Sequence, residues 1–191
     1  TPVDHIPGSL QQPGLRLPFG SSVRWSYTGG PHTAWGTGEP LSALDFAPPV
    51  SGCSLSEEPA LAVADGVISR VGEAELVLDL DGDGDERTGW SIFYLHLSTA
   101  TLPKVGTVVK AGDPLGIPSC EGGRATGSHV HIARKYNGEW ILAEGTLAFN
   151  LDGWIAYNGA TPYEGTLVRF GNTVRASVSS DALSIISADP R

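Results

Sequence analysis

The chain has 191 residues, with 21 acidic side chains against 12 Lys and Arg and a formal net charge of −9. This length suits a single domain with a sizeable core. No cluster of basic residues could follow a phosphate backbone, which argues against nucleic-acid binding. The sequence also has no apolar run of the roughly 18 residues that a membrane span needs, and no signal peptide is recognisable. We expect a monomer.

Short strands joined by tight turns are expected, because the 25 Gly and 14 Pro are frequent and long helical stretches are missing. The first residues, through Gly29-Gly30, contain scattered Pro and Gly and predict an irregular arm on the surface of the domain. Residues 61–64 and 67–71 are separated by Asp65-Gly66 and predict two strands joined by a turn.

The rest of the chain predicts further strands wherever apolar residues alternate or lie between turn residues. These are 75–80, 90–97, 105–110, 114–117, 129–135 and 139–143, and in the tail 153–157 and 165–170. Because no window shows a helical period, the predicted fold class is all-β. We expect an N-terminal arm over 1–28, a domain over 29–144, and a β-rich extension of the same domain over 145–191.

Four of the five histidines occupy positions that suit a metal site. His129 and His131 are at i and i+2 of an expected strand, so both project from one face. His96 ends an alternating strand, and His32 follows a Gly-Gly-Pro segment in an expected loop. Each alone is more often a structural or solvated side chain. Together they supply nitrogen ligands and spare imidazoles, which a hydrolytic zinc site uses.

The carboxylate that would complete such a site has a candidate in Asp45. It lies in the segment Ser42–Ala47 and is flanked by apolar residues, which predicts partial burial with a partner. A catalytic zinc typically takes three protein ligands and leaves the fourth position for water. Two histidines and Asp45 would meet this requirement.

A second candidate for a metal site is the turn-rich loop over Asp79–Asp85. Asp79, Asp81 and Asp83 are at alternate positions and Gly84 is sixth, as at the start of a calcium loop. The twelfth position is Trp90, where a bidentate Glu would be required, and flanking helices are not expected. The sequence therefore favours a polar hairpin loop, with a weak Ca²⁺ site as the alternative.

Six motifs resemble those of a known peptidase family in identity and order. They are Gly30-Pro31-His32, Leu44-Asp45-Phe46, Ala64-Asp65-Gly66-Val67-Ile68, Tyr94-Leu95-His96-Leu97, Val105-Gly106 with Ala111-Gly112-Asp113-Pro114-Leu115-Gly116, and Gly127-Ser128-His129-Val130-His131-Ile132. Over residues 29–140 the chain is similar to the lysostaphin and β-lytic family of zinc endopeptidases, which cleave peptidoglycan peptides. The resemblance implies an antiparallel β-sheet or barrel-sandwich domain with the groove and the metal on one sheet.

The resemblance also implies a role for each site residue. It assigns the ligands of one Zn²⁺ per chain to His32, Asp45 and His131. The two remaining histidines, His96 and His129, match the catalytic histidines of the family. The division of roles between these two stays open.

Two further details follow from the resemblance. The spacing of thirteen positions from His32 to Asp45 is longer than the H-x-x-x-D of lysostaphin-like members, and is similar to the β-lytic and staphylolytic branch. A tyrosine commonly assists the oxyanion in this family, and Tyr94 and Tyr157 are the candidates here.

The function implied is a zinc-dependent endopeptidase that hydrolyses peptide cross-links of bacterial peptidoglycan with a metal-activated water. The main alternative is a degenerate relative that binds cell-wall peptides without cutting them. A carrier module with Lys110 as the modified residue would leave the histidines unexplained. A cupin-type site would need a Glu a few residues after H-x-H and a histidine farther on, whereas Glu139 is eight residues after His131 and no histidine follows.

Such an enzyme acts outside the cytoplasm, so we expect a secreted or extracytoplasmic mature protein. In that oxidising setting the two cysteines, Cys53 and Cys120, are expected to form a disulfide. The alternative is a pair of small buried thiols.

Overall fold

The computed structural model describes residues 6–190 and consists almost entirely of strands. The strands are β1 Trp25–Thr33, β2 Leu41–Ala47, β3 Ala60–Leu61, β4 Gly66–Val71, β5 Glu75–Asp79, β6 Trp90–Leu95, β7 Val108–Val109, β8 Pro114–Gly116, β9 Val130–Tyr136, β10 Glu139–Trp140, β11 Asn150–Leu151, β12 Trp154–Asn158, β13 Gly165–Arg169, β14 Asn172–Arg175 and β15 Ile185–Ile186, with a 3₁₀ helix at Thr99–Thr101. All strand pairings are antiparallel, which confirms the predicted fold class. Within the described range no helix is long and apolar enough to cross a membrane.

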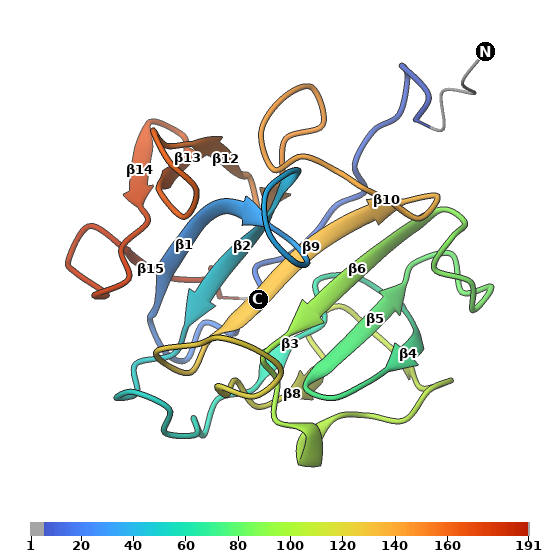
Figure 1. Cartoon of the computed structure of the whole chain (residues 1–191), viewed down its shortest axis with the longest axis horizontal. Coiled ribbons are helices and arrows are strands. Elements are labelled where there is room, and N and C mark those ends of the chain that lie inside the picture. The colour runs from blue at the N-terminus through green and yellow to red at the C-terminus, as the bar shows by residue number, and fades with distance from the viewer. Residues whose placement is uncertain (1–5, 191) are drawn as a thin grey trace.

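A nine-stranded sheet forms the body of the molecule. Its strands follow the order β15-β1-β2-β9-β6-β5-β4-β7, with β10 paired to β9. A four-stranded sheet, β11-β12-β13-β14, lies beside β1, and the short pair β3-β8 lies behind the main sheet (Figure 1). The C-terminal strands therefore pack directly against the strand that carries His32.

Side chains alternate between the two faces of the main sheet, and this alternation separates the core from the site. On β2, Leu44 and Phe46 are fully buried in the main hydrophobic cluster, while Asp45 lies between them. On β9, both neighbours of His131 belong to the same cluster. Because Asp45 pairs with His131 in the β2–β9 ladder, these two side chains lie next to each other on the face away from the core.

The N-terminal arm is irregular up to β1, but it is not only a surface feature. Leu15, Leu17 and Phe19 are at most 4 % exposed and belong to the main core. The Phe19 ring stacks on Trp25 with 4.9 Å between centroids. The scattered apolar residues of the arm carry no period, so the sequence did not reveal that they cover one side of the sheet.

The predicted hairpin of 61–64 and 67–71 is wrong. Ala60–Leu61 pairs with β8, whereas β4 pairs with β5 and β7. Ala62, Val63 and Ala64 are buried without forming a strand, and the backbone N–H of Val63 donates to the Tyr94 hydroxyl at 2.9 Å. This apolar run fills the core, where packing matters more than ladder pairing.

Candidate metal centre and catalytic cleft

An open cleft of about 720 Å³ lies on the face of the main sheet away from the core. Its floor is formed by β1, β2 and β9, and its rim by the loops that contain 47–52 and 123–129. The cleft contains all the histidines and the aspartate that the sequence singled out for metal binding and acid–base chemistry: His32, Asp45, His96, His129 and His131.

Three of these side chains bring ligand atoms together at the cleft floor. Nε2 of His32 lies 3.0 Å from Nδ1 of His131. Oδ1 of Asp45 lies 3.1 Å from the same Nδ1 and 3.3 Å from Nε2 of His32. His32 is 2 % exposed, Asp45 is 7 % exposed and His131 is 5 % exposed. The set therefore combines two imidazole nitrogens and one carboxylate oxygen in a largely buried triangle.

The far nitrogen of each imidazole identifies the tautomer that suits a metal. Nδ1 of His32 lies 2.8 Å from the carbonyl oxygen of Gly30, and Nε2 of His131 lies 3.0 Å from that of Ala34. A carbonyl only accepts, so these nitrogens carry the protons and the two facing nitrogens carry lone pairs. Two lone pairs and a carboxylate oxygen at this separation repel one another unless a cation lies between them.

The spacing of the triangle also fits zinc. Ligand atoms about 2.0–2.1 Å from a tetrahedral zinc are about 3.3 Å apart, close to the observed 3.0–3.3 Å. Nitrogen and carboxylate ligands are the set that zinc accepts. We conclude that the donor set fits this ion.

Charge interactions keep Asp45 ionised although it is buried. Burial by itself would raise its pKa, but the neighbouring imidazoles of His32, His129 and His131 outweigh burial and hold the pKa well below its usual value. Burial would lower the pKa of His32, yet the Asp45 carboxylate raises it overall. The triangle therefore contains an ionised carboxylate that attracts a cation.

The backbone turns His96 into the cleft. Strict alternation after Tyr94 would direct it to the core face, but its φ of 65° is in the left-handed region that few non-glycine residues adopt. Its ring consequently lies 4.4 Å from that of His129. Burial, and then the charge of His129, lower the pKa of His96 to about 4, so its imidazole is neutral at pH 7.

Backbone carbonyls also orient the two remaining imidazoles. Nδ1 of His96 lies 2.6 Å from the oxygen of Glu121, and Nδ1 of His129 lies 2.9 Å from that of Gly127. Each ring therefore has a free Nε2, and that of His129 is 3.8 Å from Oδ1 of Asp45. Both nitrogens are available to accept or return a proton near the triangle.

The expected disulfide between Cys53 and Cys120 is present, with a Cα–Cα distance of 5.5 Å. It joins the two loops that hold the histidine pair. Glu121, next to Cys120, accepts from His96, while the carbonyl of Gly52, next to Cys53, accepts the backbone N–H of Ser128 at 2.8 Å.

The structure does not bring the two candidate tyrosines into the cleft. Tyr94 is fully buried on the core side, where its hydroxyl donates to the carbonyl oxygen of Leu61 at 3.3 Å. Tyr157 is on the outer side of β12 and does not line the cleft. Their positions follow from strand parity: Tyr94 shares the core face with Leu76 and Ile132 in the main sheet, and β12 belongs to the second sheet.

A different tyrosine, Tyr163, lines the cleft. Its ring stacks on His32 with 4.1 Å between centroids and a 20° interplanar angle. The turn before β13 holds it there, because the N–H of Gly30 donates to the Tyr163 carbonyl at 2.7 Å. Burial and the nearby Asp45 charge raise its pKa. No motif in the sequence marked this residue; its place depends on the packing of the C-terminal sheet against β1.

Gly29 makes room for the carboxylate of Asp45, and this yields a first prediction. The two residues pair across β1 and β2, and a Cβ at Gly29 would lie 2.5 Å from Oδ2 of Asp45. Gly29→Ala should displace the carboxylate and weaken the affinity of the triangle for a metal ion by about 10–100-fold, the usual effect of disturbing the support of a metal ligand. Competition with a chromogenic chelator measures the affinity.

Gly14→Ala is the matched control, since a Cβ at Gly14 meets no atom within 4 Å. Its affinity for the metal ion should equal that of the parent chain. Unchanged affinity in Gly29→Ala would contradict the role given to this close approach.

Comparison with known proteins agrees with this geometry. Residues 46–142, about half of the chain, match Peptidase family M23. The matched segment begins one residue after Asp45 and includes His96, His129 and His131.

The chain is 28% identical over 141 residues to beta-lytic metalloendopeptidase of Lysobacter enzymogenes, covering 69% of this chain and 74% of that protein. It is 30% identical over 143 residues to the beta-lytic metalloendopeptidase of Achromobacter lyticus, of which it spans 36%. The solved M23 metalloprotease pseudoalterin from the deep sea is 25% identical, with a TM-score of 0.73, and the match covers 86% of this chain and 96% of that one. This chain therefore belongs to peptidase family M23.

Proposed function

We propose that the chain is a zinc-dependent endopeptidase that hydrolyses peptide cross-links of bacterial peptidoglycan. One observation carries the proposal: the ligand triangle of His32, Asp45 and His131 shares an open cleft with two imidazoles that each have a free Nε2. Membership of peptidase family M23 and the resemblance to the β-lytic branch support it.

His32, Asp45 and His131 would hold the ion, with His32 and His131 kept in the required tautomer by the carbonyls of Gly30 and Ala34. When bound, zinc lowers the pKa of a water molecule and polarises the carbonyl of the bond to be cut. The negative charge of Asp45, on β2, would partly offset the charge of the ion.

His96 and His129 would move the protons. Hydrolysis needs one group that accepts a proton from the attacking water and one that donates a proton to the leaving amine. The free Nε2 atoms of this pair face the same cleft, and burial keeps His96 neutral at pH 7, the form that accepts a proton. Tyr163 would act as a positioning residue by packing on His32.

The cleft walls suit a peptide with small side chains. Small residues line the rim, among them Gly52, Gly123, Ala125 and Gly127. Arg124 is the one long side chain among the lining residues 123–129, so an extended chain rich in glycine or alanine would meet mostly small side chains there, and the open cleft does not require a chain end. The disulfide supports action outside the cytoplasm, where such bonds persist.

The proposal predicts that the purified protein releases peptide fragments from purified peptidoglycan, and that a chelator abolishes this while added zinc restores it. Mass analysis of the fragments should find new amino termini inside the cross-links. Asp45→Asn, which removes the anionic ligand, should lose activity, whereas Asp65→Asn, a change at an exposed aspartate paired with Lys110, should keep it.

Binding to peptidoglycan without any released fragment would overturn the proposal in favour of a non-catalytic wall-binding relative. Activity that survives complete metal removal would overturn the role of zinc.

A further inference from the structure

The loop between β5 and β6 carries a second group of potential metal ligands, away from the cleft. Asp79, Asp81 and Asp83 alternate along the chain, and each offers a carboxylate oxygen within 4.8 Å of the other two. Gly84 follows with a φ of 84°, a left-handed conformation that a sharp turn requires and glycine adopts readily. The order matches the first half of a calcium loop.

The buried member of this group has an unsatisfied oxygen. Asp79 is 0 % exposed, and its Oδ2 accepts the backbone N–H of Gly84 at 2.7 Å. Its Oδ1 is buried and has no hydrogen-bond partner within residues 6–190. An ionised carboxylate oxygen in this condition is costly, because it has lost water without gaining a donor or a cation.

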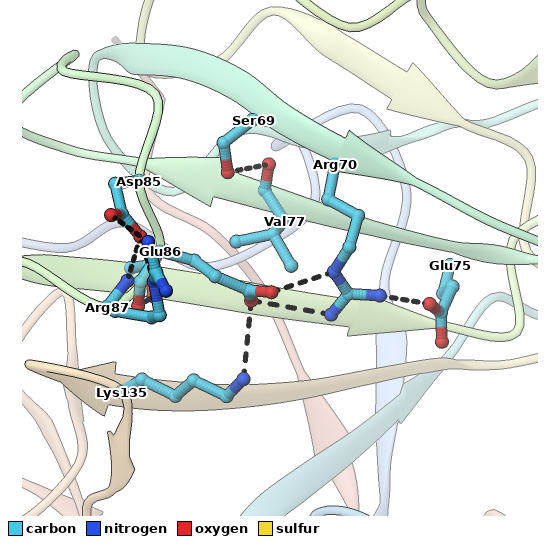
Figure 2. Close-up of polar contacts among 9 residues, drawn as sticks. Ser69, Arg70, Glu75, Val77, Asp85, Glu86, Arg87 and Lys135 are labelled. Atoms are coloured by element: carbon cyan, nitrogen blue, oxygen red, sulfur yellow. Dashed lines mark hydrogen bonds and ion pairs between the residues drawn. The ribbon is translucent and has the colours of Figure 1, made fainter.

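The cations near the loop are engaged by its other two acidic residues. Asp85 pairs with Arg87 at 2.7 Å. The Glu86 carboxylate forms ion pairs with Arg70 at 2.9 Å and with Lys135 at 3.2 Å. Figure 2 shows this carboxylate between the two cations.

Among the described residues, no ion pair reaches Asp79, Asp81 or Asp83. Three carboxylates therefore converge without a positive partner, and the most buried of them has a free oxygen. We propose that this loop binds one calcium ion through Asp79, Asp81 and Asp83.

Calcium fits better than the alternatives for chemical reasons. The group offers only oxygen, which calcium prefers, and contains none of the nitrogen or sulfur that zinc sites commonly use. Calcium also accepts irregular coordination with backbone oxygens and water, whereas magnesium demands a near-ideal octahedron. The site is separate from the proposed zinc centre, so it does not rest on the proposed function.

The loop departs from a helix-flanked calcium loop in its second half. The twelfth position is Trp90 in place of a bidentate glutamate, and strands flank the loop on both sides. Fewer carboxylates imply weaker binding, so we expect a dissociation constant of roughly 10⁻⁴–10⁻³ M, the range of extracellular calcium modules. The ion would tie together the ends of β5 and β6, the second of which leads to His96.

The test is calorimetric titration of the zinc-loaded protein with CaCl₂ and, separately, MgCl₂ in calcium-free buffer. The parent chain should bind one calcium, and magnesium at least 10-fold more weakly. Asp81→Ala should weaken calcium binding at least 10-fold. Asp85→Ala is the matched control, because it removes one negative charge from the same loop. The Asp85 carboxylate forms an ion pair with Arg87, so the calcium affinity of this variant should stay within about 2-fold of the parent.

Saturable calcium binding that only Asp81→Ala weakens supports the site. No saturable binding below about 10 mM in the parent chain, ten times the upper end of the expected range, overturns it. Equal weakening by Asp85→Ala overturns it as well, since that would indicate general attraction to an acidic loop. A thermal unfolding midpoint that rises with calcium in the parent and Asp85→Ala, but not in Asp81→Ala, provides the second readout.

Discussion

His131→Ala is expected to lose bound zinc and peptide hydrolysis together, whereas His129→Ala is expected to keep zinc while turnover falls by roughly 10²–10⁴. His131 places Nδ1 in the ligand triangle, 3.0 Å from His32 and 3.1 Å from Asp45. Removing the His131 imidazole leaves two of the three proposed protein ligands. Metal affinity falls because it depends on the number of ligands. His129 lies beside the triangle, with Nε2 at 3.8 Å from Oδ1 of Asp45, and in the proposed mechanism it transfers a proton without binding the ion.

Metal content by elemental analysis and the rate of peptidoglycan cleavage, measured on both variants, decide between the two roles. Circular dichroism of each variant checks that the strands are retained, because His131 is 5 % exposed. Zinc loss in His129→Ala with retention in His131→Ala would show that the roles are reversed. Normal cleavage by both variants would refute the peptidase proposal.

The double variant Cys53→Ala/Cys120→Ala is expected to lower the free energy of unfolding by about 2–5 kcal/mol. The bond closes a loop with a sequence separation of 67, for which the chain-entropy estimate is about 4 kcal/mol. Denaturant titration of the parent and the variant measures the difference. An unchanged free energy of unfolding would contradict this estimate.

The same variant should also lower turnover without loss of zinc. The disulfide joins the loops of Gly52 and Glu121, which support His129 through Ser128 and His96 through a carbonyl. The three proposed zinc ligands lie on β1, β2 and β9, whose pairing does not need the disulfide. Assays well below the unfolding temperature separate this effect from instability, and a parallel loss of zinc would show that the bond supports the whole site.

The sequence by itself determined the fold class and the ligand face. The period of two in His129-Val130-His131 directs both imidazoles to one side of a strand whatever its neighbours are. The apolar flanks of Asp45 indicated a buried carboxylate with a partner, and the structure places it opposite His131. The D-x-D-x-D-G order indicated the second candidate ligand group, although the sequence favoured a simple polar loop.

Only the tertiary structure decided which strands are neighbours and therefore which side chains meet. His96 reaches the cleft through a left-handed backbone, which strand parity does not predict. Tyr163 lies in the cleft, where Tyr94 and Tyr157 were expected, because a separate sheet packs on β1. Packing buries Oδ1 of Asp79, which has no hydrogen-bond partner among the described residues. Periodicity depends on the backbone geometry of one strand, whereas burial and long-range contact depend on the packing of all of them.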